Sequence, residues 1–147
     1  MPKPYRRLLR AALPRLDERA AELLEFVLLR DGDVGTAAAA ARALRLADAP
    51  AVNDLLRRAG LPAFHRLAAW VRVIEWVVTW EQDGTSLCRQ ALDAGRDPAA
   101  CYRTVQAVTG VPWRTLQRRG SAWALMELLA RCGSSQRGAR RAAAGAS

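Results

Sequence analysis

Residues 85–112 read TSLCRQALDAGRDPAACYRTVQAVTGVP, and their polar, proline and glycine positions indicate where helices begin and end. A hydroxyl residue at its start and the pair Asp97-Pro98 in its middle are typical helix beginnings, because a short polar side chain caps free backbone N–H groups and proline fits a first helical turn. Gly95 interrupts the stretch between them. The pattern predicts a helix to about Asp93, a short turn and a second helix to about Val108. This order of helix, turn and helix is a motif of many DNA-binding proteins.

The same pattern of helix-starting and helix-ending residues occurs earlier in the chain. An offset of 50 residues superimposes small, apolar, helix-ending and helix-starting positions: Ala51 on Cys101, Leu55 on Val105, Gly60 on Gly110 and Pro62 on Pro112. A repeat at a fixed offset indicates two copies of one supersecondary unit. We therefore expect two tandem helix-turn-helix subdomains, the first at residues 34–61 and the second at residues 83–120.

A long linker helix is predicted between the two units, at residues 62–82. Most of its side chains are apolar, and Arg72, Glu75 and Thr79 fall on one helical stripe, which predicts a single solvent-facing edge. At ~1.5 Å per residue the helix is roughly 30 Å long, close to the ~34 Å between successive major grooves on one face of a duplex. The spacer therefore suits a single chain that reads two adjacent grooves.

The flanking segments complete an all-α chain. Residues 1–33 are expected to contain a basic, partly helical arm and an amphipathic helix that Asp17 caps, and residues 121–132 are expected to form a C-terminal helix. Residues 133–147 consist mainly of Gly, Ser, Ala and Arg, offer nothing to bury, and are expected to form a disordered basic tail. Alanine is the commonest residue, with 30 copies, which favours helices over strands.

The charge of the chain is large and unevenly distributed. Its 147 residues include 23 Arg and Lys against 14 Asp and Glu, which gives a net charge of +9 and a pI near 11.1. Residues 1–16 carry +5, residues 17–83 carry −3 and residues 84–147 carry +7. So strong a basic excess is typical of proteins that bind a polyanion. We expect the last segment to provide the binding surface.

Four stretches carry a family resemblance: Asp54-Leu55-Leu56-Arg57-Arg58-Ala59-Gly60-Leu61-Pro62, Trp70-Val71-Arg72-Val73, Asp97-Pro98-Ala99-Ala100-Cys101-Tyr102-Arg103 and Thr109-Gly110-Val111-Pro112-Trp113-Arg114-Thr115-Leu116-Gln117-Arg118. Through them, residues 34–120 resemble the DNA-binding region of the AraC/XylS family of transcription regulators. The Thr-Gly-x-Pro ending at residues 109–112 is the most specific element. The resemblance implies two helix-turn-helix units joined by a long helix, with double-stranded DNA as the partner.

Departures from the family's pattern lie at the turns. Only Arg96 separates Gly95 from Asp97, so the second turn is one residue short, and Cys101 stands at the usually aromatic position of the second recognition helix. The corresponding position of the first recognition helix falls near Leu56. Many family members also carry a ligand-sensing domain, for which these residues leave no room. A stand-alone small member and a domain of a longer chain both remain open.

Side chains that read bases are expected on the exposed half of each second helix, because a helix in the major groove presents that half to base edges. They are Ala99, Tyr102, Arg103 and Gln106 in the second unit, and Asn53 and Arg57 in the first. Arginine pairs bidentately with guanine, and Gln or Asn with adenine. Arg103 also matches an arginine within the family's recognition helix, which serves structure as readily as base reading. Asp48 and Asp54 repel phosphates, so we expect the first unit to dock more weakly.

Phosphate contacts are expected from helix N-termini, where N–H groups and the helix dipole favour anions, and from arginines around the second unit. The candidates are Thr36, Thr85, Ser86, Arg89, Arg96, Arg114, Arg118 and Arg119. A solvated charged face explains any one of them equally well. Together, however, they cluster on the part of the chain that carries the positive excess.

The sequence contains no catalytic or metal-binding constellation, so we expect neither enzymatic activity nor a cofactor. His65 is the only histidine, and the carboxylates are scattered singly along predicted helices. Cys88, Cys101 and Cys132 lack ligand spacing and are expected to be small core residues. With no signal peptide and no apolar run near ~20 residues, the protein is expected to be cytoplasmic and without a membrane partner.

Two other functions remain open. A helical protein-interaction module on the same scaffold is favoured by the shortened turns, the acidic first unit and the Trp-rich linker. A nonspecific nucleic-acid binder is favoured by the basic ends. Trp70, Trp76 and Trp80 are expected mainly in the core, but with the N-terminal helix they also offer a surface for a homodimer or a missing sensor domain.

Overall fold

The computed structural model describes the backbone of residues 3–145 and the side chains of residues 3–132. In this part of the chain all regular secondary structure is helical, so the all-α expectation is confirmed. The elements are α1 (Pro4–Ala12), α2 (Glu18–Leu29), α3 (Ala37–Ala43), α4 (Ala49–Arg58), α5 (Phe64–Asp83), α6 (Leu87–Asp93), α7 (Pro98–Thr109) and α8 (Trp113–Gly145). The disordered tail expected at residues 133–147 lies outside the fully described residues.

Short polar side chains start five of the helices. The side-chain oxygens of Asp17, Thr36, Asp48, Ser86 and Asp97 accept hydrogen bonds from backbone N–H groups two or three residues further on. The caps predicted at Asp17 and Asp97 are confirmed, and Thr36, which was expected at a helix N-terminus, caps α3. Of the two hydroxyl residues that were expected to cap α6, Thr85 or Ser86, it is Ser86 that does so, and the cap of α4 at Asp48 was not predicted.

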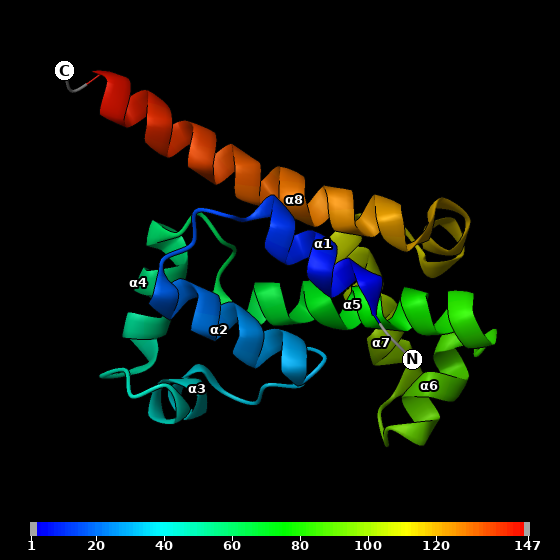
Figure 1. Ribbon diagram of the computed structural model, residues 1–147. Helices are drawn as coiled ribbons and strands as arrows, with labels where there is room; N and C mark the ends of the chain where they lie inside the picture. Colours follow the sequence, from blue (N-terminus) through cyan, green and yellow to red (C-terminus); the bar gives the residue numbers. More distant parts are fainter. Residues whose placement is uncertain (1–2, 146–147) are drawn as a thin grey trace.

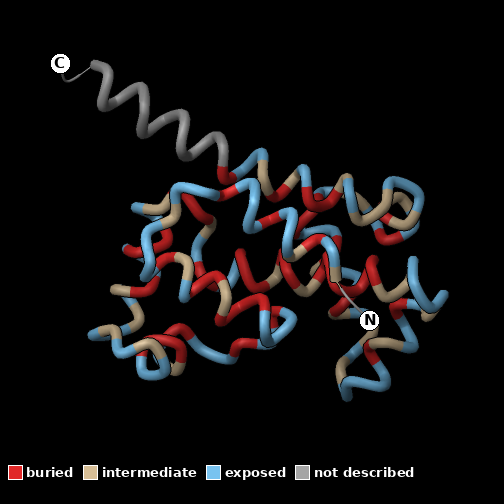
Figure 2. The backbone as a smooth tube through the Cα atoms, viewed as in Figure 1, coloured by how far each residue is buried: buried red, intermediate tan, exposed pale blue. Residues whose placement is uncertain are grey.

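Helix α5 forms the axis of the molecule (Figure 1). The pair α3–α4 lies toward one end of α5, the pair α6–α7 toward the other, and α8 runs along its side. Buried residues follow α5 and the faces of the helices turned toward it (Figure 2). Phe64, Trp70 and Ile74 are completely buried along this axis. With 20 residues at ~1.5 Å each, α5 is roughly 30 Å long, as the sequence predicted.

The single solvent-facing edge predicted on α5 is wrong. Glu75 lies on that stripe but is only 6% exposed. Its carboxylate accepts hydrogen bonds from the Tyr5 hydroxyl, from Lys3 and from Arg6. Burial and the adjacent carboxylate raise the pKa of Tyr5 above its ordinary value. Lys3 and the first turn of α1 therefore cover Glu75 and neutralise its charge instead of leaving it to water.

The N-terminal segment is correspondingly a docked helix and not a free basic arm. Tyr5, Leu9 and Leu13 are buried, and α1 packs against α8. Two of its arginines pair with acids of other elements, Arg6 with Asp31 and Arg10 with Glu25. The Arg10 guanidinium lowers the pKa of the Glu25 carboxyl. Much of the positive charge of residues 1–16 is thus neutralised by ion pairs within the molecule.

The loop between α2 and α3 lies directly on the backbone of α5 at Gly32. This residue has φ = +79°, and a Cβ placed on it would be 2.3 Å from the carbonyl oxygen of Ala68. Arg72 donates a hydrogen bond of 3.0 Å to the Gly32 carbonyl. Only glycine fits this position, because it tolerates the left-handed backbone and adds no atom to the contact.

Helix α8 bends at Gly120, whose φ of 88° and ψ of 171° are not helical. The C-terminal helix expected from residue 121 accordingly begins directly after this bend. Beyond the bend, the Ser121 N–H donates to the Glu81 carboxylate at 3.0 Å, so a side chain of α5 caps the second part of α8. Before the bend, the Gln117 side-chain oxygen accepts from the indole N–H groups of Trp80 and Trp113, at 3.1 and 3.2 Å.

Candidate nucleic-acid interface

The outer face of α7 presents the side chains that were predicted to read bases in the second unit. Cys101, Val105 and Val108 are buried on the inner face of the helix. Because one face of an amphipathic helix packs inward, the residues between them point away from the core. Ala99, Tyr102, Arg103 and Gln106 are all exposed.

Arg103 is held only loosely on this face. Its guanidinium lies 3.8 Å from the carboxylate of Asp97, and both side chains are more than 60% exposed. An exposed ion pair of this kind contributes ~0–1 kcal/mol. The guanidinium can therefore exchange Asp97 for another hydrogen-bond acceptor at little cost.

The corresponding face of α4 is engaged within the chain. Asn53 is exposed, but its side-chain oxygen accepts a 2.9 Å hydrogen bond from the Phe64 N–H. This contact caps α5, whose preceding residue Ala63 has no side chain that can do so. Arg57 pairs with Asp54 at 3.0 Å. The structure thus gives Asn53 a structural role that the sequence analysis did not foresee.

Three predicted phosphate-binding arginines lie on the first part of α8, which packs against α7. Arg114, Arg118 and Arg119 are exposed, and none has a carboxylate within ion-pair distance in the described part of the chain. Arg118 makes only a long contact of 3.5 Å to the Thr115 hydroxyl. Arg119 lies over the Trp123 ring, 4.8 Å from its centre. The outer face of α7 and these three arginines are called the α7–α8 basic face below.

The other phosphate candidates are less available. Arg89 pairs with Asp93 at 3.1 Å, and Arg96 pairs with Asp33 at 3.3 Å. The Arg96 contact joins the turn of the α6–α7 pair to the loop before α3. Three candidates lie near helix starts: Thr36 caps α3, Ser86 caps α6, and Thr85, whose carbonyl accepts from the Gln90 side chain, lies one residue before that cap.

A group of exposed arginines around the α3–α4 pair was not predicted from the sequence. Arg42, Arg45, Arg58 and Arg66 are exposed, and no carboxylate pairs with them among the described residues. They were overlooked because residues 17–83 sum to a negative charge. In the structure, several acids of that segment pair with other parts of the chain, as Asp31 and Glu75 do with α1 and Asp33 with Arg96.

The surfaces considered for a homodimer or a sensor domain are largely internal. Leu23, Val27 and Leu28 of α2 are completely buried, as is Trp70 of α5. Trp76 and Trp113 are also buried, whereas Trp80 and Trp123 are half-buried. Any such association would have to use other residues than these.

The cysteines divide into two kinds. Cys101 and Cys132 are buried as expected, and burial raises the pKa of both thiols, that of Cys132 to about 11. Cys88 is exposed, so the expectation of a core position is wrong for it. His65 is exposed, with its ring edge-on to Phe64. No three His, Cys, Asp or Glu side chains gather as a metal site within the part of the chain that the structure describes.

Compared with known proteins, the chain matches no family model, no curated protein and no solved structure. Between residues 3 and 145, no helix has both the length and the apolar character that crossing a membrane requires.

Proposed function

We propose that this chain is a sequence-specific transcription regulator that binds double-stranded DNA, with α7 in one major groove and α4 in the next. The observation that carries the proposal is the α7–α8 basic face. There, Tyr102, Arg103 and Gln106 are exposed on α7, and three exposed arginines of α8, the helix packed against α7, have no acidic partner in the described part of the chain. Arginine and glutamine can read guanine and adenine in the major groove, while neighbouring arginines neutralise phosphates.

The arrangement of the helix pairs supports two-groove binding. Both pairs flank α5, whose length of roughly 30 Å is close to one turn of the duplex. The resemblance of residues 34–120 to the DNA-binding region of AraC/XylS regulators favours the same function. The α3–α4 pair brings exposed arginines of its own, although its second helix also carries Asp54.

A salt titration tests the electrostatic part of the proposal. If about six phosphates are neutralised, the logarithm of affinity should fall with the logarithm of salt concentration with a slope of roughly −5. Fluorescence anisotropy with a labelled random duplex, between about 50 and 200 mM salt, measures this slope. An affinity that stays constant over that range would contradict the proposal and favour a protein-interaction module.

A matched pair of variants separates base reading from phosphate contact. Arg103→Ala should reduce the preference for the best sequence over a random duplex. Arg118→Ala should weaken binding to all sequences alike and make the salt slope shallower by about 1. Competition binding with the selected and random duplexes distinguishes these outcomes. Equal, sequence-independent weakening by both variants would show that Arg103 reads no base.

A further inference from the structure

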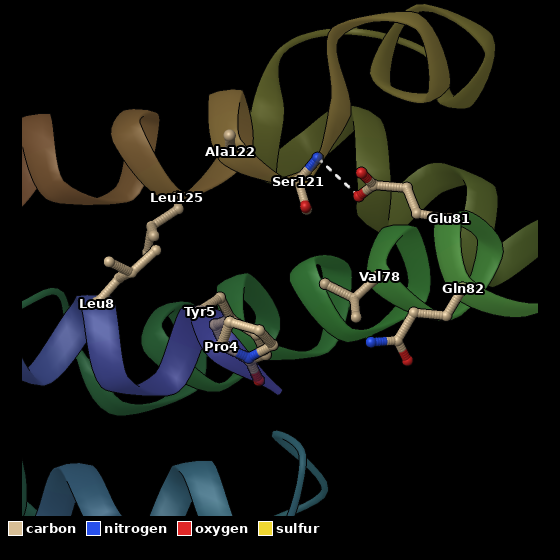
Figure 3. A pocket seen from close by; sticks show the side chains of 9 residues that line it. All are labelled: Pro4, Tyr5, Leu8, Val78, Glu81, Gln82, Ser121, Ala122 and Leu125. Carbon is tan, nitrogen blue, oxygen red and sulfur yellow. Dashed lines mark hydrogen bonds between the residues drawn. The ribbon is translucent and has the colours of Figure 1, made fainter. Parts of the chain in front are cut away.

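A small cavity lies between α1, α5 and the part of α8 that follows its bend (Figure 3). Its volume is about 240 Å³, below the roughly 300–1,000 Å³ of sites for drug-sized ligands. Leu8, Val78 and Leu125 form apolar walls from the three helices. The ring of Tyr5 also lines it, with its hydroxyl already donated to Glu75. The cavity thus suits a short apolar chain.

One carboxylate, that of Glu81, borders this apolar space. One of its oxygens accepts the Ser121 N–H, as the dashed line in Figure 3 shows. No Lys or Arg of the described residues lies within ion-pair distance of Glu81, in contrast to Glu75 on the same helix. The second oxygen is therefore a carboxylate acceptor that has no Lys or Arg partner between residues 3 and 132.

We propose that this cavity binds a small organic cation, a primary ammonium on an apolar chain of about four to eight carbons. The chain packs between Leu8, Val78 and Leu125, and the ammonium donates to the second oxygen of Glu81. An ammonium is a compact charge with three donors, which matches one accessible carboxylate oxygen. A carboxylate ligand would be repelled by Glu81, and a neutral alcohol would gain only the apolar contacts. The proposal is independent of DNA binding.

The binding test uses n-hexylammonium, with hexanol and hexanoate as probes of matched length. Titration of the DNA-free protein, followed by amide resonances in NMR spectra, should give a Kd of about 1 mM for n-hexylammonium. The largest shifts should fall on Leu8, Ser121 and Ala122. Hexanol and hexanoate should bind at least about threefold more weakly. Equal affinity for the three probes, or shifts that avoid these residues, would overturn the proposal.

Two variants locate the ammonium and the chain. Glu81→Gln keeps an acceptor for the Ser121 N–H but removes the charge, and should weaken n-hexylammonium about two- to fivefold. Asp83→Asn removes the same charge two residues further on and should leave the affinity unchanged. Ala122→Phe adds a ring to an exposed residue of the cavity and should abolish binding without altering the fold. Equal effects of the first two variants, or full binding by the third, would contradict the assignment.

Discussion

The α3–α4 and α6–α7 pairs share one local design. In each, a hydroxyl side chain caps the first helix and an aspartate caps the second, which has a proline in its first turn. Each second helix is followed by a glycine in the left-handed region, Gly60 at φ = 76° and Gly110 at φ = 78°. The turn residue is left-handed in both, as Arg45 at φ = 56° in one and Gly95 at φ = 68° in the other.

The two pairs differ in what their second helices present. The outer face of α7 carries Tyr102, Arg103 and Gln106, with only a long contact to Asp97. The face of α4 instead uses Asn53 to cap α5 and holds Arg57 beside Asp54. The comparison shows that a common backbone pattern does not make two equivalent surfaces. We infer that the outer face of α4 is partly engaged in contacts within the chain, whereas the outer face of α7 is available for binding.

The largest expected effect is on the free energy of unfolding, when the glycine before each helix pair is replaced by alanine. Gly32 and Gly84 both have positive φ, but a Cβ would clash with the α5 backbone only at Gly32. Gly32→Ala should lower the free energy of unfolding by about 3 kcal/mol or more, and Gly84→Ala by about 1–2 kcal/mol. Chemical denaturation measures both values. Similar losses for the two variants would show that the loop at Gly32 is not anchored on α5.

The next prediction compares the arginines of the two outer faces. Arg103→Ala should weaken binding to the preferred duplex by about 1–3 kcal/mol, because a bidentate contact to guanine is lost. Arg57→Ala should change affinity by less than about threefold, because its guanidinium already has a carboxylate partner. Anisotropy titrations at one salt concentration provide the comparison. A larger effect of Arg57→Ala would reverse the assignment of the dominant face.

Substitution of Asn53 tests whether this side chain caps α5 or contacts a DNA base. Asn53→Ala removes the acceptor for the Phe64 N–H and should lower the free energy of unfolding by about 1 kcal/mol. Asn53→Asp keeps an acceptor and should retain the stability of the parent. Thermal and chemical unfolding of the two variants measure the difference. Loss of DNA affinity in Asn53→Ala with unchanged stability would instead indicate base reading.

Substitutions at the left-handed residues of the two turns should change the free energy of unfolding by smaller amounts and in opposite directions. Arg45→Gly relieves a left-handed non-glycine backbone but increases the freedom of the unfolded chain, so a net gain of about 0.5 kcal/mol is expected. Gly95→Ala imposes the same strain and should cost about 1 kcal/mol. Opposite signs in the unfolding free energies would support equivalent turns. A loss of stability in Arg45→Gly would mean that the Arg45 side chain contributes to the fold.

The last prediction compares the reactivity of two cysteines within the α6–α7 pair and involves no change in stability. Cys88 on α6 is exposed, whereas Cys101 on α7 is buried with a raised pKa. Iodoacetamide should modify Cys88 of the native protein and leave Cys101 protected, since the thiolate is the reactive form. Mass spectrometry of tryptic peptides, with the denatured protein as control, measures this. Equal modification of both would contradict the packing of α7 on α5.

The sequence predicted those parts of the fold that depend on neighbouring residues. The caps at Asp17 and Asp97, the start of a helix at residue 121 and the length of α5 all follow from local patterns. Contacts between distant segments could not be found in this way. The burial of Glu75 depends on α1. Its hydrogen bond partner Tyr5 lies 70 residues earlier in the chain. Periodicity alone therefore assigned that carboxylate to solvent.

At the candidate site, too, local patterns were predictable from the sequence and contacts between distant residues were not. Helical spacing correctly placed Ala99, Tyr102, Arg103 and Gln106 on an exposed face. It could not reveal that Asn53 caps another helix, because that contact joins residues eleven positions apart across a turn. Net charge per segment was also misleading, since it treats acids that pair with distant arginines as if they repelled phosphate locally. The arginines of the first pair were missed for that reason.

Selection from random double-stranded DNA determines whether two unequal helix pairs read adjacent grooves. We expect an asymmetric site with two conserved segments about ten base pairs apart. We also expect Arg103→Ala to relax the more strongly conserved segment. Recovery of unselected sequences, or no recovery of DNA at all, would contradict the account.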